Sequence, residues 1–101
     1  MEKKTYIVVR SDIPPGLQMA QACHAAIAFT VAHGVLTDNL VVLHVETVGD
    51  LVSIQQRADI DGIRSVAFHE PDLRDEVTAI ALADEARVFL SSLPLAMKRA
   101  A

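Results

Sequence analysis

Four short runs of apolar residues, separated by stretches with helical spacing, constrain the fold of this 101-residue chain more than any other feature. The runs are rich in β-branched side chains and contain few polar positions. This pattern is typical of strands that are buried on both faces beneath helices. We therefore expect strands at residues 6–9, 40–45, 63–68 and 77–82.

Helical spacing is clearest in the segment from Leu17 to His33, which is rich in Ala, has neither Pro nor Gly, and stops before Gly34. A second helix is expected around residues 51–58, and a short third helix over 84–93, with Val88, Phe89 and Leu93 as its apolar stripe. The long helix has a broad apolar arc, and 3-4-3-4 spacing predicts that its core-facing residues are Leu17, Ala20, His24, Ile27 and Val31.

The order of these elements predicts an α/β fold. Strand–helix–strand units favour parallel strands joined by right-handed crossovers. The loop between the third and fourth runs, residues 70–76, is too short for a parallel crossover but long enough for a hairpin. We expect one domain over residues 1–101, a three-layer α/β/α sandwich around a mixed four-stranded sheet whose last strand is antiparallel.

Composition limits the classes of function. Nine basic and 13 acidic residues give a formal net charge of −4, which argues against a broad basic surface for a nucleic-acid duplex but not against a local patch. The basic clusters are Lys3, Lys4 and Arg10 at one end of the chain and Lys98 with Arg99 at the other. The single cysteine, Cys23, excludes an internal disulfide and is expected to be a small core residue. With no apolar run long enough to span a bilayer and no signal peptide, a cytoplasmic location is expected.

Polar residues collect where this topology predicts a ligand site. Open α/β sheets bind ligands beyond the carboxyl ends of their parallel strands. The start of the long helix lies at the same edge and presents free N–H groups and a positive dipole end. From the ends of the first and third strands, the start of the fourth and the first turns of the helix, we expect a convergence of Arg10, Asp12, Gln18, Gln21, His24, His69, Glu70 and Thr78.

At these residues the chain resembles the type II peptidyl-tRNA hydrolase family. The matching segments are I-V-V-R-S-D-I at residues 7–13, Q-A-C-H-A-A at 21–26 and T-A-I-A-L at 78–82. The likeness covers nearly the whole domain, because the intervening elements agree in order and length. The resemblance implies an α/β/α sandwich, a homodimer, and hydrolysis of the ester between peptide and tRNA without a metal or other cofactor.

Two departures from the family pattern bear on the chemistry. A family lysine lies in a G-K-G-K segment after the first strand, whereas residues 14–19 here are P-P-G-L-Q-M. A family loop D-A-G-R-T, whose Asp is the proposed water activator, is replaced by E-P-D-L-R at residues 70–74. Ester hydrolysis needs an activated water and a stabilised oxyanion. The resemblance implies catalytic roles for Glu70, Thr78 and His24, and substrate binding by Arg10, Asp12, Gln18 and Gln21.

A second function stays open at this point, a catalytically inactive module that binds an RNA end, a protein or a small ligand at the same edge. The missing lysine and the net acidity favour this module, whereas the surviving polar constellation favours the hydrolase. His24 is either a hydrogen-bonded core histidine or a site residue, and residues 70–76 are either a solvated acidic loop or part of the site. Too few ligands accompany His69 and Glu70 for a metal site. The expected partners are peptidyl-tRNA and a second copy of the chain.

Overall fold

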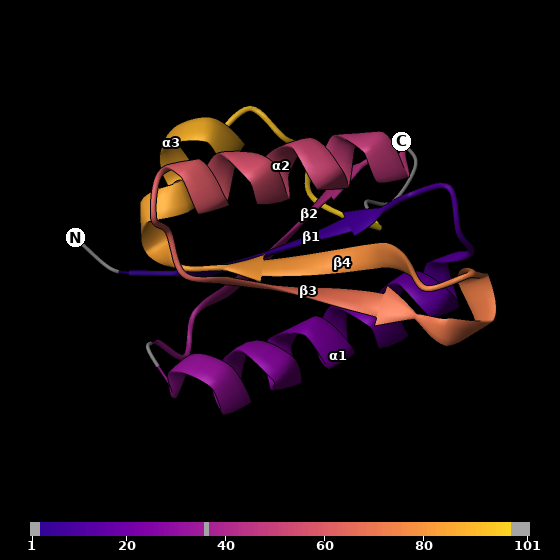
Figure 1. Ribbon diagram of the computed structural model, residues 1–101, viewed down its shortest axis with the longest axis horizontal. Helices are drawn as coiled ribbons and strands as arrows, with labels where there is room; N and C mark the ends of the chain where they lie inside the picture. The colour runs from indigo at the N-terminus through magenta and orange to yellow at the C-terminus, as the bar shows by residue number, and fades with distance from the viewer. Residues whose placement is uncertain (1–2, 36, 98–101) are drawn as a thin grey trace.

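A computed structural model describes residues 3–35 and 37–97 of the chain; the basic pair Lys98 and Arg99 lies outside them. Figure 1 shows a sheet between two helical layers. The strands are β1 (Thr5–Arg10), β2 (Leu40–Val45), β3 (Ser65–Glu70) and β4 (Glu76–Leu82). The helices are α1 (Pro15–His33), α2 (Val48–Ile60) and α3 (Arg87–Leu90), with 3-10 turns at Pro71–Leu73 and Asp84–Ala86.

The sheet has the order β2-β1-β4-β3. β1 and β2 are parallel, in a register that runs from Thr5↔Leu40 to Arg10↔Val45. β4 is antiparallel to both of its neighbours and forms a hairpin with β3, closed by the pair Glu70↔Glu76. The predicted α/β class and the mixed four-stranded sheet with a reversed last strand are therefore confirmed.

The two central strands are buried on both faces. Along β1, Ile7 and Val9 pack with α1, while Val8 packs with α2 and α3, as the alternation of a strand requires. α1 covers one face of the sheet, and α2 with α3 covers the other (Figure 1). Within residues 3–35 and 37–97, no helix is long and apolar enough to cross a membrane.

The predicted core face of the long helix is wrong. Ile27 and Val31 are 63% and 83% exposed, and Ala20, Cys23 and His24 are exposed too. The residues that α1 buries are Gln18, Gln21, Ala22, Ala25 and Phe29. Apolar residues lie on several faces of the helix, and it contains no Asp, Glu, Lys or Arg to mark a solvent-exposed face. Spacing alone therefore did not identify the buried face. The small alanines let the helix approach the sheet closely, and both glutamines find hydrogen bonds.

Two other boundaries differ from the expectation. β3 begins at Ser65 and continues to Glu70, two residues further than predicted, because the ladder resumes after a bulge beside Phe68. The last helix is shorter than predicted. Of its predicted apolar stripe, Phe89 and Leu93 pack against the core, whereas Val88 is 71% exposed, and the fully buried residue is Leu90. A 3-10 turn precedes this helix, and Ala86 of the turn and Leu90 of the helix both belong to the core cluster.

Candidate functional site

Arg10, at the end of β1, is 8% exposed and holds two carboxylates. Its guanidinium forms a two-point pair with Asp12, Nε to Oδ1 at 2.7 Å and Nη2 to Oδ2 at 2.8 Å. Nη1 donates to Glu76 Oε1 at 2.7 Å and to the carbonyl of Val77 at 3.3 Å. Hydrogen bonds from Arg10 lower the pKa of Asp12, and the same bonds raise the pKa of Arg10. Arg10 and Asp12, which were both expected at this edge, are in direct contact, and one cation faces two anions.

Gln21 links α1 to the end of the sheet. Its side chain is 1% exposed; Nε2 donates to Glu70 Oε1 at 3.2 Å, and Oε1 accepts from Thr78 Oγ1 at 2.8 Å. Because a carboxylate only accepts hydrogen bonds, Gln21 must turn its NH₂ group to Glu70, and Thr78 must donate to the amide oxygen. This chain of bonds gives the half-buried Glu70 carboxylate a defined orientation.

A β-bulge explains how Thr78 reaches Gln21. The register passes from Phe68↔Ala79 to His69↔Val77, so Thr78 is the extra residue on β4. Regular alternation would place Thr78 on the face of Ile80, which packs toward α2. The bulge instead re-aims the side chain to α1, as bulges beside functional sites often do. Thr78 is fully buried and donates to Gln21, so in this geometry it orients a neighbour and does not face solvent.

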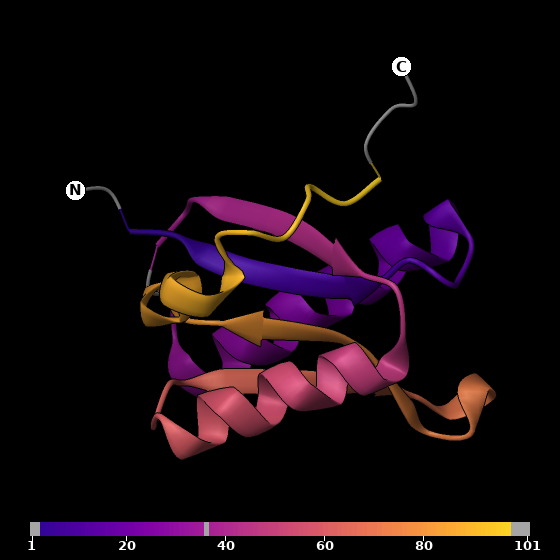
Figure 2. The same ribbon diagram turned by 90° about the horizontal axis from the view of Figure 1, so that it is seen from above.

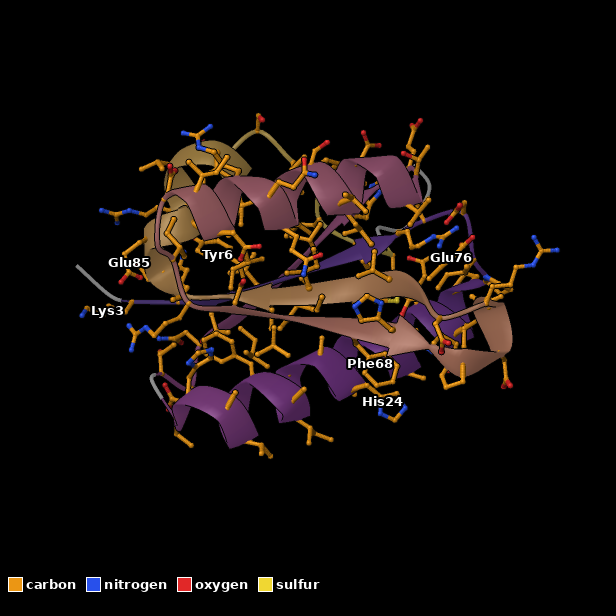
Figure 3. All side chains as sticks on the ribbon, viewed as in Figure 1. Lys3, Tyr6, His24, Phe68, Glu76 and Glu85 are labelled. Atoms are coloured by element: carbon orange, nitrogen blue, oxygen red, sulfur yellow. The ribbon has the colours of Figure 1, made fainter. Side chains whose placement is uncertain are left out.

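His24 lies one turn further along α1 and is exposed. Its ring stacks on Phe68 of β3, with centroids 4.7 Å apart and planes 10° apart (Figure 3). The stack lies at the same end of the sheet as Glu70. It therefore provides a flat, partly aromatic surface next to the oriented carboxylate, and His24 is not a core histidine.

Gln18 is buried, 5% exposed, and its Nε2 donates to the carbonyl of Ile13 at 2.7 Å. The bond ties the loop after β1 to the first turn of α1. Its Oε1 has no hydrogen-bond partner among the residues of the structure that are described. Gln18 therefore anchors the loop, and the predicted substrate contact is not part of this arrangement.

The hairpin after Glu70 is tightly bent. Arg74 and Asp75 have φ of 56° and 57°, the left-handed region that costs side chains with a Cβ about 1–2 kcal/mol each. The bend is held by Asp75 N–H, which donates to the carbonyl of Glu70, and by His69 Nδ1, which donates to the carbonyl of Asp75. A hollow of about 160 Å³ opens here, lined by Asp72, Leu73, Arg74 and Glu76. Backbone strain of this kind concentrates at functional sites.

The structure divides the predicted site into two groups. Gln21, Glu70, Thr78 and His24 meet around the end of β3, whereas Arg10, Asp12 and Glu76 form an ion cluster at the start of β4. Sequence reasoning missed Phe68 and Glu76. The signal for Glu76 was the hairpin, because a short loop brings residue 76 opposite residue 70. Across residues 3–35 and 37–97, no group of three or more His, Cys, Asp or Glu side chains is placed to hold a metal ion.

Comparisons with known proteins support the architecture. No family model matches the chain, and no curated protein matches it. Among solved structures, the chain is similar to a protein of unknown function, Atu0240, from Agrobacterium tumefaciens strain C58. The TM-score is 0.73 and the identity 14%, over 94% of this chain and 98% of the other. At this identity the likeness shows the α/β fold alone.

Proposed function

We propose that the chain is an ester hydrolase in which Glu70 activates water, with peptidyl-tRNA as the substrate that the sequence resemblance implies. The observation that carries the proposal is the Thr78–Gln21–Glu70 chain of hydrogen bonds, which orients a half-buried carboxylate at a sheet edge. Gln21 is a neutral donor, so it orients Glu70 without supplying a positive charge. A carboxylate held in this way is suited to accept a proton from water.

The proposed hydrolysis uses water as its only co-reactant. Glu70 takes a proton from water as the water oxygen bonds to the ester carbonyl carbon. The tetrahedral intermediate then collapses, and the bond between that carbon and the tRNA ribose oxygen breaks. The proton held by Glu70 passes to the leaving oxygen, which gives a tRNA with a free hydroxyl and a peptide with a carboxylic acid, which then releases its proton to solvent. The His24–Phe68 stack beside Glu70 offers a surface for the terminal base.

Arg74 is the cation that best suits the phosphates of such a substrate. It is exposed in the hairpin that follows Glu70 and lines the hollow of about 160 Å³. Arg10 is less suited, since Asp12 and Glu76 already occupy its donors. A guanidinium binds phosphate through two parallel hydrogen bonds, which makes Arg74 a positioning group in this proposal.

One observation favours the second function, a binding module without turnover. The ion cluster pairs one arginine with two carboxylates, so the edge around Arg10 is net negative. Loss of one electrostatic donor lowers the rate of a catalysed reaction by about 10²–10³-fold. Because Arg10 is already paired, it supplies no free cation, and ester hydrolysis at this edge would be slow. The two functions differ in whether bound peptidyl-tRNA is released intact.

A turnover assay with purified peptidyl-tRNA tests the hydrolase. We expect Glu70→Gln to lower the rate by about 10²–10⁴-fold, the usual contribution of a general base, with melting temperature unchanged. Glu85→Gln is the matched control, because Glu85 lies at the opposite end of the sheet from Glu76 (Figure 3). A wild-type chain that binds peptidyl-tRNA and releases it intact would instead establish the binding module. Equal turnover by wild type and Glu70→Gln would remove Glu70 from the mechanism.

We also propose a symmetric homodimer through the outward face of α1. This face exposes Met19, Ile27 and Val31, and the helix from Pro15 to His33 has no Asp, Glu, Lys or Arg. Two copies of a chain with net charge −4 meet there without opposing like charges. Light scattering should give a dimer mass for wild type and for the control Gln56→Lys on α2, and a monomer mass for Ile27→Lys. A monomeric wild type contradicts the proposal.

A further inference from the structure

A second hollow lies on the other face of the sheet, away from Glu70. Its volume is about 390 Å³, within the range of small-molecule sites. It opens between α2, the end of β2 and the segment after α3. Figure 2 shows α2 and this C-terminal segment running along opposite sides of the layer, with β1 between them. Among the residues that line it are Glu46, Asp50, Ser53, Ile54, Phe89 and Leu93.

The hollow lies next to the carboxyl end of one of the two parallel strands. β1 and β2 are adjacent and parallel, but the helices that follow them, α1 and α2, lie on opposite faces of the sheet. Ligands of open α/β sheets bind outside the carboxyl ends of strands at such a switch point. Glu46 follows the last residue of β2 directly, and Asp50 lies in the first turn of α2. One wall of the hollow is therefore formed at the carboxyl end of β2, on the α2 face of the sheet.

The lining has two chemical parts. Ile54, Phe89 and Leu93 form an apolar wall. The guanidinium carbon of Arg57, which does not line the hollow, lies over the Phe89 ring, 4.9 Å from its centroid. Arg57 is itself paired with Asp61 at 2.7 Å, so it adds no net positive charge to the hollow. Glu46 and Asp50 are exposed and supply two negative charges at the mouth.

This combination selects a ligand class. We propose that the hollow binds a small amine with an aromatic or branched apolar body, its ammonium group facing Glu46 and Asp50. The apolar body lies against Ile54, Phe89 and Leu93, and burial of its surface supplies most of the affinity. The hydroxyl of Ser53 is a further acceptor for the ammonium protons. A carboxylate ligand of the same size is repelled by the two acidic side chains.

Three probes that share one body and differ in charge test the proposal. Phenethylamine is the cation, phenethyl alcohol the neutral analogue and hydrocinnamate the anion. In amide NMR titrations of the full chain, phenethylamine should give saturable shifts at Asp50, Ser53 and Leu93. A Kd of about 1 mM is expected for a ligand of this size. The alcohol should bind at least about threefold more weakly, the strength of an exposed ion pair, and hydrocinnamate should not saturate.

Variants locate the binding within the hollow. The double variant Glu46→Gln with Asp50→Asn should lower the affinity for phenethylamine at least about threefold and leave the affinity for the alcohol unchanged. Asp59→Asn, an exposed carboxylate further along α2, is the control for charge and should change neither. Ser53→Phe should block both probes, whereas Gln56→Phe on the exposed side of α2 should block neither. Circular dichroism and melting temperature verify that each variant is folded.

Three outcomes overturn the proposal. The first is an absence of saturable shifts with phenethylamine. The second is equal binding of the amine and hydrocinnamate, which would show that charge does not select the ligand. The third is binding that survives Ser53→Phe in a folded variant, which would place the amine elsewhere. Because peptidyl-tRNA turnover is measured separately, failure here leaves the hydrolase proposal intact.

Discussion

At the scale of single residues, the site separates two kinds of carboxylate. Glu76 and Asp12 are tied to Arg10 by short hydrogen bonds, so their charge is compensated and their positions are fixed. Glu70, the register partner of Glu76, is held by the amide of Gln21. Neighbouring acids with different partners can take different roles: the ion pair holds Asp12 and Glu76, and the hydrolase proposal assigns proton transfer to Glu70.

The Arg10–Asp12 pair predicts how stability depends on pH. Arg10 lowers the pKa of Asp12 in the folded chain, so the unfolded chain binds the proton more tightly. The contribution of the pair is complete above the ordinary Asp value of about 4, and is lost as the pH falls through and below it. Urea unfolding at pH 7 and pH 3 should therefore show that Asp12→Asn loses less unfolding free energy between the two pH values than wild type does.

Asp59 is an exposed carboxylate on α2. In the same experiment Asp59→Asn should lose as much unfolding free energy between pH 7 and pH 3 as wild type. If Asp12→Asn and wild type lose equal stability between the two pH values, the ion pair with Arg10 does not contribute to folding.

The buried Gln21–Thr78 hydrogen bond predicts an energetic coupling. Gln21→Leu or Thr78→Val alone leaves a buried polar partner unsatisfied, which costs about 1–3 kcal/mol. The double variant removes both groups, so its loss of unfolding free energy should be at least about 0.5 kcal/mol smaller than the sum. Gln56→Leu, at an exposed position, controls for the change of residue type. Strictly additive losses would argue that this bond is not formed.

At the scale of elements, the sheet was predictable and the helix faces were not. Apolar strands such as β1 and β4 leave few alternatives, because both faces of each strand must be covered. α1 has a broad apolar arc, so its periodicity gave no unique answer, and packing of Ala22 and Ala25 against the sheet decided its face. The bulge at Thr78 depends on how β3 and β4 pair, which a single sequence does not reveal.

The same limit applied to the candidate site. Arg10 and Asp12 were expected together because they lie two residues apart at one strand end, and they pair. The contact between Gln21 and Thr78 requires both the correct face of α1 and the bulge in β4, so the sequence predicted only that they share an edge. The predicted topology placed Glu70 at this edge, the sequence resemblance implied its role, and the hairpin register shows Glu76 opposite it.

The short C-terminal helix gives a direct test of the corrected face. Leu90 is fully buried, whereas Val88 is 71% exposed. Leu90→Ala should lower the unfolding free energy by about 2–5 kcal/mol, the range for a large core side chain cut to Ala. Val88→Ala should change it by less than about 0.5 kcal/mol, as surface substitutions usually do. Similar losses in the two variants would contradict the packing of α3.

At the scale of the whole molecule, one sheet connects two apolar clusters. The cluster under α1 and the cluster under α2 and α3 share the central strands β1 and β4, so neither cluster can form without these strands. The candidate hydrolase site lies on the α1 side, while the hollow for the amine lies on the α2 side. Both sites therefore depend on the same sheet.

This shared sheet predicts a single cooperative unfolding transition. Tyr6, the one tyrosine in a chain without tryptophan, packs against the α2-side cluster, so its fluorescence reports on that layer. Far-UV circular dichroism reports on both helical layers, because α1, with 19 residues, lies on the other side of the sheet from α2 and α3. In urea the two signals should give the same midpoint, as two-state domains do. Separate midpoints would show that the two layers unfold independently.

Single-turnover hydrolysis of peptidyl-tRNA in ¹⁸O-labelled water distinguishes whether Glu70 activates a water molecule to cleave the ester. General-base catalysis predicts that the label enters the carboxylate of the released peptide, that Glu70 gains none, and that Glu70→Gln releases no peptide on the same time scale. Label in the Glu70 side chain would indicate a covalent acyl intermediate. That result, or a wild-type chain that releases no peptide, would contradict the account.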